Sequence, residues 1–102
     1  MKKSLQLYQR VSKIYEELED FETASYFYNR SLEISKEAKY VDGEALAYTG
    51  LGICEEKVLN VYESIKYLET ALEKAIDGGL SKIERTISQE LVKVYKKIAM
   101  DH

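Results

Sequence analysis

The chain is predicted to fold as an all-α protein of five helices, and three features of its sequence support this prediction. Apolar residues recur at intervals of three and four along most of its 102 residues, which is the spacing of one face of an α-helix. There is no proline and there are only five glycines, too few for the many turns of an all-β protein. The residue pattern also repeats after 40 positions, which predicts stacked helical hairpins.

The composition excludes several classes of protein. Hydrophobic residues make up 45% of the chain and charged residues 32%, which is typical of a globular protein and not of a disordered one. The net charge is -3 and acidic and basic residues are interspersed, so no surface for nucleic acid is expected. No apolar run reaches the roughly 18 residues of a membrane span, so membrane insertion is not expected. A lone cysteine, Cys54, and the lack of a signal-peptide core predict a cytoplasmic location.

The first two helices are predicted from their apolar stripes. The first is expected over 4–18, and its buried stripe is expected to comprise Leu7, Val11, Ile14 and Leu18. The second is expected over 21–38, with Asp20 as its N-cap. Because only two or three residues join them, the two helices are expected to form an antiparallel hairpin.

The other three helices are predicted from their ends. The third is expected to follow Asp42, its predicted N-cap, and to end near residue 58. The fourth is expected to follow Asn60, also a predicted N-cap, and to end before Gly78-Gly79. Ser81, with a glutamate three positions later, forms a capping-box pattern that predicts a fifth helix over 81–99.

The repeat becomes visible when the chain is aligned with itself so that Ile14, Cys54 and Val94 correspond. Small residues then match small ones along the second and fourth helices. The alignment divides the chain into a first repeat over 4–41, a second over 42–80 and a terminal helix over 81–99. Gly52 lies inside a helix, where glycine is unfavourable, so the fourth helix is expected to cross there at close range. Lys39 aligns with Gly79, so Lys39 or a neighbour is expected to adopt a left-handed conformation.

These residues resemble the tetratricopeptide repeat (TPR) family, in a subclass with repeats of about 40 residues. The first repeat carries the family pattern at Tyr8, Val11, Ser12, Tyr15, Ala24, Tyr28 and Ser31, and the second at Tyr48, Leu51, Gly52, Ser64, Leu68 and Ala71. Glu55 departs from it, since an aromatic residue is usual there. The resemblance implies a right-handed solenoid, part of a larger TPR protein. It also implies a non-enzymatic scaffold that binds a protein or peptide in its concave groove, as in ciliary TPR proteins. The alternative is a peptide-sensing regulatory domain of a signalling protein.

In TPR arrays the first helices of the repeats line the groove. The resemblance therefore assigns the groove to Gln6, Gln9, Arg10, Lys13, Leu46, Thr49, Ile53, Lys57, Gln89, Lys93 and Lys97. An ordinary solvated surface is the alternative interpretation of the same residues. Apolar residues on two sides of the fifth helix also predict self-association, as a homodimer or with further repeats of the parent protein. This patch comprises Ile83, Ile87, Leu91, Val92 and Tyr95. Leu5 and Leu7 of another copy are one expected contact for it.

No catalytic, metal or cofactor site is predicted. The only histidine, His102, ends the chain, and Cys54 aligns with packing residues and has no histidine placed to activate it. The acidic residues follow solvated helix faces. The glycine pair at 78–79 is not followed by the lysine and serine or threonine of a phosphate-binding loop. These residues therefore predict a protein that is not an enzyme, whereas the expectation that it binds other proteins is what the TPR resemblance implies.

Overall fold

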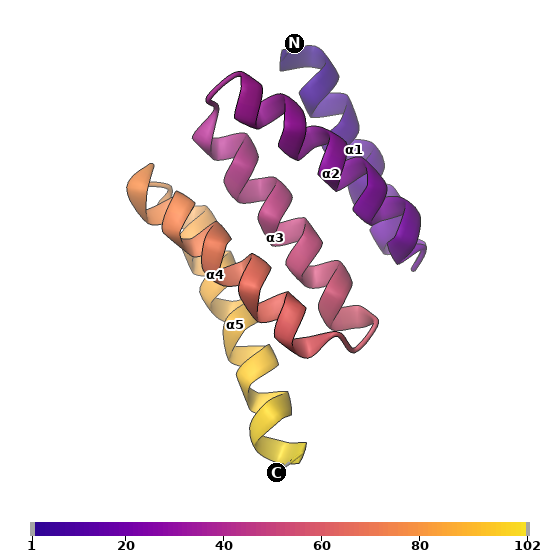
Figure 1. The fold of residues 1–102 in the computed structure, drawn as a ribbon, viewed down its shortest axis with the longest axis vertical. Coiled ribbons are helices and arrows are strands. Elements are labelled where there is room, and N and C mark those ends of the chain that lie inside the picture. The colour runs from indigo at the N-terminus through magenta and orange to yellow at the C-terminus, as the bar shows by residue number, and fades with distance from the viewer. Residues whose placement is uncertain (1, 102) are drawn as a thin grey trace.

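A computed structural model describes the backbone of residues 2–101 and the side chains of residues 3–100. Within this range the chain forms five helices and no strand: α1 (Lys2–Glu17), α2 (Phe21–Glu37), α3 (Val41–Lys57), α4 (Val61–Asp77) and α5 (Ser81–Asp101) (Figure 1). The all-α prediction and the five helices are confirmed. The helix ends differ slightly from the predicted ones at most positions.

Four turns of the same geometry connect the helices and recur at equal intervals along the chain. The third residue of each turn donates its backbone N–H to the carbonyl oxygen five positions earlier, as from Asp20 to Tyr15 at 2.9 Å and from Tyr40 to Ser35 at 2.8 Å. This is the Schellman arrangement, which places the preceding residue in the left-handed region. These residues are Glu19 (φ 63°), Lys39 (55°), Leu59 (68°) and Gly79 (66°). The prediction for Lys39 is confirmed, and three of these four positions hold a residue with a side chain.

The turn geometry, more than capping side chains, determines where each helix begins. Asp20 is an N-cap as predicted, and its carboxylate accepts the backbone N–H of Thr23 at 3.2 Å. Asp42 is not a cap, because α3 begins at Val41 after the N-cap Tyr40. Asn60 is the N-cap of α4, but its side-chain amide donates to Glu55 at 2.8 Å and caps no backbone group.

The predicted cap at Ser81 is also displaced. Ser81 is the first residue of α5, and the carbonyl oxygen of Leu80 accepts the first helical bond, from Glu84 at 2.9 Å. The equivalent bond at the start of α2 connects Asp20 and Ala24 at 3.0 Å. Leu80 therefore occupies the place of Asp20: the N-cap of α5 lies one residue before the serine, and Ser81 is already helical.

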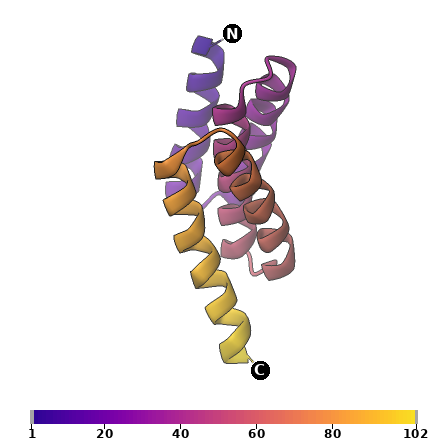
Figure 2. The same ribbon diagram turned by 90° about the vertical axis from the view of Figure 1, so that its left-hand side faces the viewer.

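The helices lie in two layers. Each helix contacts the next one along the chain, and α3 also contacts both α1 and α5, whereas within the described residues no Cα atom of α2 lies within 8 Å of one in α4. Figure 2 shows α1 and α5 on one side of the molecule and α2 and α4 on the other. The result is an elongated, flat body with principal extents of 45 × 30 × 18 Å.

Two hydrophobic clusters lie between the layers. One joins α2 to α3 through Ala24, Tyr28, Leu32, Ala47, Leu51 and Cys54. The other joins α3, α4 and α5 through Ala45, Leu68, Ala71, Ala75, Ile87, Leu91 and Val94. Gly52 lies where α3 and α4 cross, since a Cβ built there would be only 2.7 Å from Leu68 Cγ. The predicted close approach at Gly52 is confirmed.

The predicted buried stripe of the first helix is wrong. Leu7, Ile14 and Leu18 are 63%, 55% and 69% exposed, whereas Leu5 is buried. The equivalent residues of α3, Ala47 and Cys54, are buried because α2 covers them. α1 is the first helix that the structure describes, so no helix in that range covers the corresponding face. The buried side of α1 is instead the one that faces α2 and α3.

Candidate functional site

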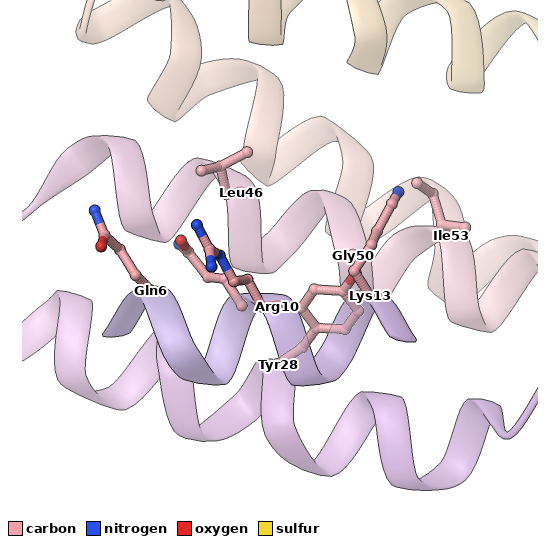
Figure 3. A pocket seen from close by; sticks show the side chains of 8 residues that line it. Gln6, Arg10, Lys13, Tyr28, Leu46, Gly50 and Ile53 are labelled. Carbon is pink, nitrogen blue, oxygen red and sulfur yellow. The ribbon is translucent and has the colours of Figure 1, made fainter. Parts of the chain in front are cut away.

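A hollow of about 450 Å³ lies between α1 and α3, and a residue of α2 contributes to it. Its lining comprises Gln6, Gln9, Arg10, Lys13, Tyr28, Leu46, Gly50 and Ile53. Figure 3 shows the polar side chains on one helix and Leu46 and Ile53 on the facing helix. The hollow therefore has a polar, basic wall from α1 and an apolar wall from α3. We call it the α1–α3 groove.

Tyr28 and Gly50 together shape the inner part of the groove. The Tyr28 ring lies against Gly50 so closely that any side chain at position 50 would collide with it. The phenolic O–H donates to Glu16 Oε1 at 2.7 Å. Burial and the neighbouring Glu16 carboxylate raise the pKa of Tyr28 above its usual value, so the hydroxyl stays protonated. Tyr28 is thus held as a hydrogen-bond donor on α2, below the open part of the groove.

The two cations of the groove differ in their surroundings. Lys13 Nζ lies 3.6 Å from Glu16 Oε2, so this carboxylate interacts with both Lys13 and Tyr28. Arg10 is exposed and has no ion-pair partner among residues 3–100. Because an exposed guanidinium can bind a carboxylate with two hydrogen bonds, Arg10 is the cation of the groove best placed to receive an acidic ligand.

The remaining groove side chains provide hydrogen-bonding and apolar contacts. Gln9 is half-buried, and its Nε2 atom is buried with no hydrogen-bond partner among the described residues. Leu46 is 41% exposed and Ile53 is half-buried. A ligand with both acidic and apolar groups would therefore find matching contacts on the two walls.

Six of the eleven residues assigned to the groove from the sequence line this hollow: Gln6, Gln9, Arg10, Lys13, Leu46 and Ile53. Thr49 is buried, and its hydroxyl donates to the Ala45 carbonyl oxygen at 2.7 Å, so it contributes no groove contact. Lys57 is exposed on α3 outside the lining.

The three groove residues predicted on the last helix lie apart from the hollow. Lys97 Nζ is 2.9 Å from Glu56 Oε1 and connects α5 to α3. Lys93 pairs with Glu90 on its own helix at 3.4 Å, and Gln89 is exposed. These side chains stabilise the α3–α5 contact or face solvent, and none lines the α1–α3 groove.

Sequence reasoning assigned Tyr28 to packing and missed its place in the groove. Tyr28 aligns with Leu68, which is fully buried, so the alignment by size suggested a core residue. One signal was present in the sequence. Gly50 is a second helical glycine close to Gly52, and its lack of a side chain leaves room for a large ring from the neighbouring helix.

The predicted self-association patch is reduced by the structure to two exposed residues. Ile87 and Leu91 are buried in the cluster with Leu68, Ala71 and Ala75, and Ile83 packs against that cluster. These three were expected at the surface, but they are covered because they lie on the side of α5 that faces α4. Val92 and Tyr95 are 64% and 47% exposed, and the Tyr95 hydroxyl donates to Glu69 at 3.1 Å.

Comparisons of the chain with protein families, with curated proteins and with solved structures found no match. In the part of the chain that the structure describes, no helix is both long and apolar enough to cross a membrane. Among the same residues, no group of three histidine, cysteine, aspartate or glutamate side chains is arranged to hold a metal ion.

Proposed function

We propose that the chain is a non-enzymatic module that binds a segment of a partner protein in the α1–α3 groove. The observation that carries this proposal is the pairing of two unlike walls across one hollow. Arg10, without an ion-pair partner among residues 3–100, lies on one wall, and Leu46 and Ile53 lie on the other. Peptide sites commonly combine apolar pockets with a few placed polar groups, which give specificity. The occupant we propose is a peptide segment that carries both acidic and apolar residues.

The wider proposal is that the chain forms part of a right-handed TPR solenoid. Three observations support it: the internal alignment of the sequence, the antiparallel helical hairpins, and the contacts of α3 with α1 and α5 that place alternate helices in one layer. A repeat array exposes one layer as a continuous surface, and the α1–α3 groove opens between two helices of that layer. The buried, unpaired Cys54 thiol suits the reducing cytoplasm proposed for the protein.

The experiment is a selection of short peptides from a random display library on the intact chain, followed by titration of the selected peptides. We expect peptides enriched in acidic and apolar residues, and binding weakened about tenfold or more by Arg10→Glu, which corresponds to the loss of a charge-assisted contact. Ile53→Glu is expected to weaken binding similarly.

Lys57→Glu is the matched control, because it makes the same kind of charge reversal on α3 outside the groove lining. Circular dichroism of each variant checks that the helices are retained. A selection that yields no saturable binder, or binders affected equally by Lys57→Glu and Arg10→Glu, contradicts the proposal. A peptide-sensing regulatory domain would use the same groove, and it would additionally change its contact with an effector domain when the peptide binds.

A further inference from the structure

An exposed aliphatic stripe runs along α1 on the side away from the rest of the molecule. It comprises Leu7, Val11, Ile14 and Leu18, and we call it the outer stripe of α1. Val11 is half-buried, and the other three are exposed over more than half of their surface. Single exposed apolar residues are ordinary, but four on one face of one helix form a contiguous surface of the kind that marks an interaction site.

The places of Leu7, Val11 and Ile14 occur twice more in the chain, at the offset of the sequence repeat, and a helix covers them both times. In α3, Ala47, Leu51 and Cys54 are buried against Ala24, Tyr28 and Leu32 of α2. In α5, Ile87, Leu91 and Val94 are buried against Leu68, Ala71 and Ala75 of α4. The outer stripe of α1 is therefore a third copy of a surface whose other two copies are helix–helix interfaces in this molecule.

α5 is the closer template for α1, both in side-chain size and in charge. Leu7, Val11 and Ile14 correspond to Ile87, Leu91 and Val94, all large aliphatic residues, whereas α3 has alanine and cysteine at two of these places. α1 carries four basic and two acidic residues, and α5 carries five basic and three acidic. The helix that covers α5 is acidic, since α4 carries four acidic and two basic residues.

We propose that the outer stripe of α1 is a docking site for an acidic amphipathic helix of a partner polypeptide, which packs there as α4 packs on α5. The partner helix carries small residues at the places of Ser64, Ala71 and Ala75 of α4, and leucine at the place of Leu68. Its acidic flank lies next to the exposed cations Lys3 and Arg10, which border the stripe near Leu7.

A second copy of this chain does not provide such a helix. Its α2 contacts both α1 and α3, and its α4 contacts both α3 and α5, so their packing faces are occupied. The free face of α5 presents Val92 and Tyr95, but α5 has more basic than acidic residues, as α1 does. Like charge disfavours that pairing. The acidic character of the covering helix is therefore what disfavours a second copy of this chain as its source.

The first experiment uses a synthetic peptide of residues 61–77, labelled at its N-terminus, as the acidic helix. Fluorescence anisotropy of the labelled peptide, titrated with the intact chain, is expected to show saturable binding with a Kd below about 1 mM. Leu7→Glu is expected to weaken it about tenfold or more. Val92→Glu is the matched control, since it places the same charge at an equally exposed aliphatic residue on α5. Equal weakening by Val92→Glu, or no saturable binding, overturns the proposal.

A second experiment joins the covering helix to the chain, so that the helix does not have to fold as an isolated peptide before it packs on the outer stripe of α1. Residues 61–80 are duplicated directly before Met1, so that the duplicate precedes α1 at the same spacing at which α4 precedes α5. A higher denaturation midpoint than that of the original chain is expected, and Ile14→Glu should remove the gain. If the midpoint does not rise, the stripe does not accept such a helix and the proposal is wrong. A rise without binding of the free peptide overturns the assignment to a separate polypeptide.

Discussion

Gly52→Ala tests the close crossing of α3 and α4, and its effect follows from two opposing contributions. Glycine to alanine inside a helix usually stabilises by about 1 kcal/mol. Here the added Cβ would lie 2.7 Å from Leu68 Cγ, 2.8 Å from Leu68 Cδ2 and 3.3 Å from the Ser64 carbonyl oxygen. Such overpacking typically costs about 1–3 kcal/mol.

The cost at Gly52 should lie at the upper end of this range. Leu68 is fully buried, so its side chain has no solvent side to move into. α4 is also held in place, because the Ser64 hydroxyl donates to the Gly52 carbonyl oxygen at 2.7 Å. The expected net effect of Gly52→Ala is a destabilisation of about 2 kcal/mol, which lowers Tm by about 10 °C in a domain of this size. Gly52→Leu should cost more.

A double-mutant cycle isolates the collision from other effects. Leu68→Ala alone should destabilise by about 2–5 kcal/mol, because it leaves a cavity. In that background Gly52→Ala no longer meets Leu68, so it should stabilise by about 1 kcal/mol and give a coupling free energy of about 3 kcal/mol. Guanidinium unfolding followed by circular dichroism measures all four proteins. Additive effects of the two substitutions, or a stable Gly52→Ala variant, would refute the proposed crossing.

Three further predictions concern the turns, the buried thiol and the assembly state. Lys39 and Gly79 both have left-handed φ. Lys39→Gly should therefore leave the free energy of unfolding unchanged or raise it by up to about 1 kcal/mol, whereas Gly79→Ala in the equivalent turn should lower it by about 1–2 kcal/mol. A clear loss of stability in denaturant unfolding of Lys39→Gly would contradict this. Burial raises the pKa of Cys54 from its usual 9.0 to about 11, so the unfolded thiol ionises first and the free energy of unfolding should fall between pH 9 and pH 11. Cys54→Ala should reduce that slope by about 1 kcal/mol per pH unit, and an unchanged slope in urea titrations would count against a buried thiol. Self-association through α5 is expected from the sequence, and Val92 and Tyr95 are the residues of the predicted patch that stay exposed. It should appear in sedimentation velocity at tens of micromolar and weaken in Val92→Glu, whereas a strictly monomeric chain would contradict that expectation.

The helices and their order follow from local features of the sequence. Apolar spacing of three and four residues is a local property, so it predicted five helices without knowledge of their partners. The cost of glycine inside a helix likewise predicted the close crossing at Gly52. The alignment of the chain with itself predicted the left-handed backbone at Lys39, because equivalent places in a repeat have equivalent backbone geometry. What it missed locally was the start of α3 and the N-cap of α5, where hydrogen bonds of the preceding turn outweighed the side chains of Asp42 and Ser81.

Which apolar faces are buried depends on how the helices pack together. Leu7 and Ile14 have the same spacing as Ile87 and Val94, yet the first pair is exposed and the second is buried, because α4 covers α5 and no described helix covers α1 in that way. Tyr28 became part of the groove only through Gly50 on a different helix. A sequence pattern specifies which face of a helix is apolar, but burial depends on whether a second helix is present at the right place to cover it.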